Sequence, residues 1–204
     1  LAIGLIGKAE TFYVSTSGND SWNGLDSIYV SGTTGPWASW QKAFQSAQAG
    51  DTVYFRGGTY NPTVTTGMGI APANSGTAVN PICFFNFPGE TPILDNSTLD
   101  SDAIYSGYGY NYCINYQSPG TLGFHKYKGL EIKNVWQQGN PMLCAGINIG
   151  GCSNLWFENM SVHDISGGCF VMVNFDSIWV KNCDAYNACD TTHPTMPGNW
   201  GMGF

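Results

Sequence analysis

The side chains best suited to chemistry lie near the end of the chain. His163 and Asp164 are adjacent, and the carboxylates Asp184 and Asp190 follow them. An imidazole beside a carboxylate can act as an acid–base pair, but adjacent residues of a strand point to opposite faces. We therefore predict that His163 and Asp164 form a turn at the end of their strand, not a catalytic pair.

Other kinds of reactive site are missing from the sequence. It contains no nucleophile elbow, phosphate-binding loop or Ser/His/Asp arrangement. Its seven cysteines suit an oxidising compartment, but they form no Cys-x-x-Cys motif and no zinc-finger spacing with histidine. Their odd number leaves at least one unpaired. Buried thiols and local bridges such as Cys144–Cys152 both remain open.

The composition favours many short strands with polar turns. Glycine occurs 27 times, and only 10% of the residues are charged, fewer than long helices with salt-bridged faces need. The net charge is −7, and the seven basic residues are spread along the chain. Without a basic patch to neutralise phosphates, we expect no nucleic-acid partner.

Three similar segments start at residues 130, 155 and 178, a spacing typical of one solenoid coil per repeat. Each alternates with period two, as a strand does, and so directs its apolar residues to one side. We expect these residues to face the core: Leu130, Ile132, Leu155, Phe157, Ile178 and Val180.

The residues between the apolar positions of the three segments support the same alignment of the segments with one another. Stacked coils place equivalent residues over one another. Lys133, Glu158 and Lys181 would then alternate in charge, and a second column of Glu131, Trp156 and Trp179 would bring two indoles together. The asparagines that end the strands share the parity of the core residues and are expected to form an amide ladder: Asn134, Asn159 and Asn182.

The rest of the chain completes the solenoid. Residues 145–150 and 168–173 supply a second strand per coil, with Ile147 beside Phe170. Earlier coils are less regular, and we expect strands at 51–56, 81–85 and 112–116, separated by loops at 61–80 and 97–109.

A helical pattern precedes the first regular strand. Trp40, Ala43, Phe44 and Ala47 share one helical face, and Gly50 is a stop signal. Because a solenoid needs a cap over its open end, we assign this helix to that role. The predicted fold is all-β: a parallel β-helix with a short N-terminal capping α-helix.

Several motifs resemble the opening of extracellular right-handed β-helix proteins, namely pectate lyases and the wider polysaccharide-lyase and alginate-epimerase-like group. They are residues 12–20, 22–24, 48–60 and 81–95. The resemblance covers nearly the whole chain from Glu10. It is specific for the fold and weak for chemistry.

A narrower resemblance, carried by residues 162–164, 182–187 and 190–194, is to the calcium-dependent pectate lyases with a ten-coil β-helix. It implies a Ca²⁺ site to which Asp184 and Asp190 would contribute. In that family the segment continues into Asn-Ala-Asp-Gly-Phe, whose Asp is the first calcium ligand. Here Gly201 or Met202 stands in that place.

The implied site is incomplete in this sequence. Ca²⁺ usually takes six or more oxygen ligands, so two carboxylates do not make a site. A turn-forming Asp190 is the alternative to a calcium ligand. His193 and Trp200 lie where the family's groove starts, which implies contact with a sugar; a packed loop is the alternative.

The two ends of the chain suggest a secreted fragment. Residues 1–9 are interpreted as a signal-peptide remnant, too short to span a membrane, with Gly7 and Ala9 before the cleavage point. Residues 10–204 would be the β-helix domain, truncated at its C-terminus. An uncapped last coil would favour end-to-end self-association.

Two functions remain open from the sequence. The first is the N-terminal part of a lyase that cleaves an acidic, pectate-like polysaccharide. The second is a non-catalytic β-helix for glycan binding, adhesion or extracellular fibre assembly.

Overall fold

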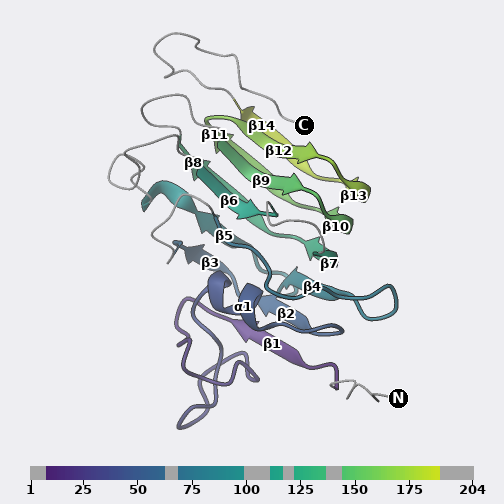
Figure 1. Cartoon of the computed structure of the whole chain (residues 1–204). Coiled ribbons are helices and arrows are strands. Elements are labelled where there is room, and N and C mark those ends of the chain that lie inside the picture. The colour runs from purple at the N-terminus through teal and green to yellow at the C-terminus, as the bar shows by residue number, and fades with distance from the viewer. Residues whose placement is uncertain (1–7, 63–68, 99–110, 117–121, 137–143, 189–204) are drawn as a thin grey trace, which may run out of the picture.

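Short parallel strands make up most of the computed structural model, which describes residues 8–62, 69–98, 111–116, 122–136 and 144–188. In the later coils each turn of the chain adds one strand to each of three sheets, and successive turns stack along one axis (Figure 1). The predicted all-β parallel β-helix is confirmed.

The three sheets contain strands of successive coils in parallel pairs. The six-stranded sheet has the order β1 (Thr11–Val14), β2 (Thr52–Phe55), β4 (Ile82–Asn86), β7 (Gly123–Lys128), β10 (Ser153–Glu158) and β13 (Asp176–Lys181). The five-stranded sheet has the order β14 (Asp184–Ala188), β11 (Ser161–Ile165), β8 (Glu131–Val135), β5 (Pro92–Asp95) and β3 (Gly58–Tyr60). The three-stranded sheet contains β12 (Gly168–Val173), β9 (Cys144–Gly150) and β6 (Asn111–Asn115). A 3₁₀ turn, η1 (Asn96–Thr98), follows β5.

Inward-facing rings form a stack through the core. Phe84, Tyr127 and Phe157 occupy the same register position on three neighbouring strands of the six-stranded sheet. The Tyr127 ring centroid lies 5.2 Å from that of Phe84 and 5.1 Å from that of Phe157. Stacking of identical positions thus extends the apolar core from coil to coil.

The predicted helix is α1 (Trp40–Ser46), which packs on the core beside β2. Ser39 is its N-cap, because its side chain accepts a hydrogen bond from the Lys42 amide. Phe44 is fully buried against Phe55 and Phe84, which confirms the sealing role of the helix aromatics. The helix ends before Ala47, earlier than the predicted stop at Gly50.

The alignment of the first repeat is wrong. Residues 131–135 form β8, which belongs to the five-stranded sheet and pairs with β5 and β11. The strand that pairs with β10 is β7. Glu158 therefore lies between Lys128 and Lys181, not beside Lys133, and the column that holds the two indoles contains Lys126, not Glu131.

The backbone at the three asparagines explains the error. Asn134 lies inside β8, whereas Asn159 and Asn182 follow β10 and β13, yet all three have positive φ, between 53° and 58°. The same sequence pattern therefore occurs at two different places relative to the strands. The Asn182 side chain donates to Asn159 Oδ1 at 2.7 Å, which confirms the ladder for this pair. Asn134 instead donates to Asp95 Oδ1. Asn159 and Asn182 are exposed, so they do not share the inward direction of the core residues.

Other local predictions have mixed outcomes. Phe170 pairs with Ile147 as expected, but Ile70, within the expected loop 61–80, bridges Ile114 of the three-stranded sheet. Of the two alternatives left open for Cys144 and Cys152, the structure has the buried thiols and no disulfide between them. Cys144 Sγ instead contacts the Val135 carbonyl at 3.1 Å. No helix among the described residues is long and apolar enough to cross a membrane.

Candidate functional site

Two tryptophans lie side by side on the outward face of the six-stranded sheet. Trp156 of β10 and Trp179 of β13 are register partners, and their ring centroids are 5.8 Å apart. The Trp179 side chain is 47% exposed. The parallel register forces this arrangement, since the same outward position of two stacked coils carries indole.

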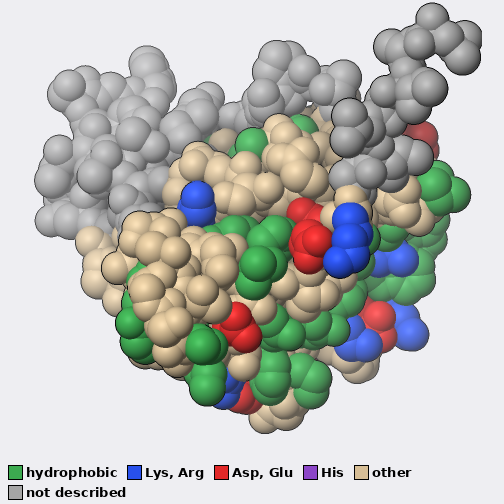
Figure 2. Space-filling view, turned by 90° about the horizontal axis from the view of Figure 1, so that it is seen from below, with side chains coloured by type: hydrophobic (Ala, Val, Ile, Leu, Met, Phe, Trp, Pro, Cys, Tyr) green, Lys and Arg blue, Asp and Glu red, His purple; other side chains and the backbone are tan. Residues whose placement is uncertain are grey.

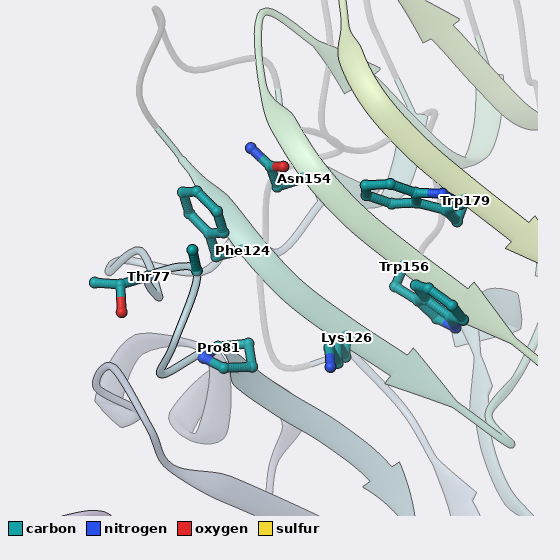
Figure 3. Close-up of a pocket in the computed structure, with 8 residues that line it drawn as sticks. Thr77, Pro81, Phe124, Lys126, Asn154, Trp156 and Trp179 are labelled. Carbon is teal, nitrogen blue, oxygen red and sulfur yellow. The ribbon is translucent and has the colours of Figure 1, made fainter.

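A shallow hollow of about 250 Å³ adjoins the two indoles (Figure 3). Phe124 and Lys126 reach it from β7, Asn154 and Trp156 from β10, and Trp179 from β13. The segment before β4 closes one side. The lining is mostly apolar: Thr77, Ala78, Pro81, Phe124, Lys126, Asn154, Trp156 and Trp179.

A second hollow, of about 230 Å³, shares Lys126 and Trp156 with the first. Its remaining lining residues come from the later part of the same strands and from β4: Phe85, Tyr127, Lys128 and Glu158. Because the two hollows share Lys126 and Trp156, we treat them as one surface, which we call the Trp156 groove. Its residues are those that line the two hollows.

The Trp156 groove has an excess of positive charge. Glu158 pairs with Lys128 at 3.6 Å and with Lys181, beside the groove, at 3.8 Å. None of the ion pairs found among the described residues includes Lys126. Seen from the end at which β1 lies, charged side chains form small separate groups among hydrophobic and uncharged ones (Figure 2). With Lys126 and Lys128 against Glu158, the lining of the groove is net positive on a chain whose net charge is −7.

This combination of side chains suits a sugar with an acidic group. Indole and phenyl surfaces bury the apolar face of a ring, while the indole N–H keeps a polar edge available. A lysine ammonium makes charge-assisted hydrogen bonds with carboxylates. The groove offers both kinds of contact within one depression.

A second polar cluster lies on the five-stranded sheet around His163. Its Nδ1 is 2.7 Å from Asp164 Oδ2, and its Nε2 is 3.3 Å from Glu131 Oε1. The ring also stacks on Tyr186 of β14, with centroids 4.5 Å apart. The predicted turn is wrong, because His163 and Asp164 lie within β11 (Ser161–Ile165), and their side chains are in contact although alternation would separate them.

The backbone at Asp164 causes this contact. Its φ of 54° breaks the alternation of the strand, so its carboxylate turns toward the neighbouring imidazole. Hydrogen bonds from His163 and Asn187 lower the pKa of Asp164. Because both imidazole nitrogens contact carboxylates, the cluster ties β8, β11 and β14 together and leaves neither nitrogen free for a substrate.

Of the two residues proposed as calcium ligands, the described residues include only Asp184. Asp184 begins β14, is exposed, and is the register partner of Ser161. No group of three or more His, Cys, Asp or Glu side chains in the described part of the chain could hold a metal ion. Asp190, His193 and Trp200 lie outside the described residues.

The Trp156 groove contains residues that the sequence analysis left without a functional role. The adjacency of Trp156 and Trp179 was predicted, and this was the available signal for a sugar-binding surface. Lys126 was missed because residues 123–128 carry lysines and a histidine in place of an apolar repeat and were not identified as a strand.

Known proteins resemble this chain in both sequence and structure. The family described as "Pel9A-like, right handed beta helix region" matches residues 12–204. Pectate lyase PEL9 of Emericella nidulans is 38% identical over 91 residues, which cover 45% of this chain and 20% of that protein. The chain thus spans about a fifth of the curated relative.

Two solved structures share the fold. Pectate lyase Pel9A aligns with a TM-score of 0.54 and 22% identity, covering 89% of this chain and 40% of Pel9A. A GH136 lacto-N-biosidase from Eubacterium ramulus aligns with a TM-score of 0.59 and 16% identity, covering 85% of this chain and 34% of that enzyme. At these identities the likeness shows the fold alone. The match over residues 12–204 is what places the chain in a family: it belongs to the Pel9A-like right-handed β-helix proteins.

Proposed function

We propose that this chain is part of a secreted lyase that cleaves an acidic, pectate-like polysaccharide by calcium-assisted β-elimination. The observation that carries the proposal is the Trp156 groove, where apolar walls suited to sugar rings adjoin the cationic Lys126. The similarity to pectate lyase PEL9 supports the same class of substrate.

The proposed reaction removes the C5 proton of a uronate and expels the oxygen at C4, which leaves a C4–C5 double bond. A neutral base must accept the proton, and a lysine can do so only where a nearby cation lowers its pKa. A bound Ca²⁺ would neutralise the uronate carboxylate and so acidify the neighbouring C–H bond. No described residue is assigned as this base.

The described residues do not fit a complete calcium site. Asp184 is a single exposed carboxylate, and Ca²⁺ takes six to eight oxygen ligands. Calcium binding by Asp184 together with Asp190, and sugar contacts by His193 and Trp200, therefore remain parts of the proposal. No step of the reaction is assigned to these residues.

The test uses the protein expressed from its complete gene. It is incubated with polygalacturonate in calcium, and the ultraviolet absorbance of the unsaturated product is followed; a parallel sample contains a calcium chelator. We expect absorbance to rise with calcium and to stop with chelator. Saturated products, or no cleavage of any polyuronate, would contradict the lyase proposal.

Non-catalytic glycan binding is the second candidate function. It is favoured by the Trp156 groove itself, because apolar walls beside a lysine can hold an acidic sugar without any catalytic group. The same experiment separates the candidates, since binding of polygalacturonate without an unsaturated product would support this second function.

A further inference from the structure

We infer that the Trp156 groove is a two-subsite binding site for an oligouronate, a sugar chain with one carboxylate per ring. The inference rests on the proposed function for its substrate class, and it adds the place, the direction and the specificity of binding. Its evidence is the order of the two hollows and the positions of the lysines in them.

The two hollows follow one another along the strands. The first is lined by Phe124 and Asn154 near the starts of β7 and β10, and the second by Lys128 and Glu158 at their ends. The stretch from Asn154 to Glu158 spans about 13 Å of strand, which is long enough for two linked sugar rings. The shared residues, Lys126 and Trp156, lie where the rings would be joined.

Each hollow has its own apolar wall. The first has Pro81, Phe124 and the exposed Trp179, and in Figure 3 these side chains lie around Lys126 and Trp156. The second has Phe85. A ring in each hollow would therefore bury an apolar face, and desolvation of these aromatic surfaces favours binding.

The groove also has two lysines for the carboxylates of the ligand: Lys126, shared by both hollows, and Lys128 in the second. Lys126 takes part in no ion pair found among the described residues, and Lys128 shares Glu158 with Lys181. In and beside the groove, the positive charges of three lysines are thus partly offset by the single carboxylate of Glu158. This charge balance favours a uronate over a neutral sugar, because a neutral sugar gains nothing from the unpaired lysine.

Glu158 should weaken the binding of an acidic ligand. Its carboxylate competes with the ligand for Lys128 and repels a uronate placed in the second hollow. Removing this charge should therefore raise the affinity for an acidic sugar and leave that for a neutral sugar nearly unchanged. A purely structural role for Glu158 does not predict this change.

The inference is tested by titrating this chain with trigalacturonate and with the neutral galactose trimer of the same linkage, using calorimetry in the presence of a calcium chelator. Lys126→Gln should weaken trigalacturonate binding about tenfold, as expected for one charge-assisted contact. Trp179→Ala should weaken the binding of both trimers, and Glu158→Gln should strengthen only that of the acidic one.

The matched control is Lys133→Gln, which removes the same charge from the five-stranded sheet, outside the groove. It should change the affinity less than twofold, because Lys133 lies on another sheet and its ammonium is 4.0 Å from the Asp95 carboxylate. Circular dichroism identifies any variant that fails to fold, and Trp179 is a safe position because its side chain is 47% exposed.

Three results would overturn the inference. They are no binding of trigalacturonate by the unaltered chain, equal losses for Lys126→Gln and Lys133→Gln, and unchanged affinity in Trp179→Ala. If the complete protein still forms unsaturated product in any of these cases, the lyase proposal stands and only the groove assignment fails. If it forms no product but trigalacturonate binds in the predicted order, the groove stands and the lyase proposal fails.

Discussion

Three polar side chains, Tyr116, His125 and Tyr127, are buried in the apolar core. Hydrogen bonds offset the free-energy cost of removing them from water. The Tyr116 hydroxyl contacts His125 Nδ1 at 2.8 Å and also bonds the Tyr127 hydroxyl. His125 Nε2 lies 2.8 Å from the Asn74 carbonyl oxygen, so Nε2 carries the hydrogen and Nδ1 accepts. Burial lowers the pKa of His125 from 6.5 to about 4, which keeps the imidazole neutral.

His125 should make the stability of the fold depend on pH. Its folded pKa is about 4 and its ordinary pKa is 6.5, so the unfolded chain binds more protons between these values. Stability is full above pH 6.5 and falls as the pH approaches 4, by about 3 kcal/mol for a shift of this size. Urea unfolding at pH 7 and pH 4.5 measures the loss.

The matched variant is His125→Gln, which keeps a hydrogen-bonding side chain but cannot be protonated. It should be less stable than the natural chain at neutral pH and lose less stability on acidification. An equal loss in both proteins would assign the pH dependence to other groups, such as Glu90, whose pKa is lowered by its hydrogen bonds with Arg56.

The alternation of residues along a strand predicts the direction of their side chains only while the backbone stays extended. His163 and Asp164 show the limit: the alternation rule separates them, but a φ of 54° at Asp164 brings their side chains to 2.7 Å. Asparagine and aspartate adopt this left-handed conformation more readily than most residues. A sequence does not reveal which of its many asparagines and aspartates do so, because the choice depends on the neighbouring coils.

At the scale of elements, repeats with apolar inward positions could be assigned from the sequence. β10 and β13 were placed in the right register by Leu155, Phe157 and Ile178, and their indoles meet as expected. β7 could not be found this way, because its inward positions are His125 and Tyr127. Its neighbour β8 matched the apolar pattern better and was placed in the wrong sheet.

The ends of the strands depend on residues that tolerate positive φ. Asn159 has φ 53° and accepts a hydrogen bond from Asn182, while Gly129 has φ 66° at the equivalent place one coil earlier. Asn159→Ala should destabilise the fold by about 2 kcal/mol, since it adds the cost of a left-handed alanine to the lost hydrogen bond. Thermal unfolding measures the difference.

The comparison variant for this position is Asn159→Gly. Glycine accepts the left-handed backbone without a steric cost, so only the exposed hydrogen bond is lost and the effect should be below about 1 kcal/mol. Equal destabilisation by alanine and glycine would mean that the backbone conformation contributes nothing at this turn.

At the scale of the whole molecule, the parallel winding brings distant parts of the sequence to one surface. Phe85, Lys126, Trp156 and Trp179 come from four different strands, and only the coil register makes them neighbours. The fold class could be predicted because its apolar repeats recur along the chain. The groove could not, because it depends on the register of β7 and on the segment before β4.

The measurement that tests the central claim most directly is the affinity of this chain for polygalacturonate and for the matching neutral polymer at two ionic strengths. We predict that the acidic polymer binds in dilute salt and the neutral one much more weakly. Binding of the acidic polymer should fall sharply near 1 M salt, where the screening length is about 3 Å. Equal affinity for both polymers, or acidic binding that salt does not weaken, would contradict an acidic polysaccharide as the ligand of this β-helix.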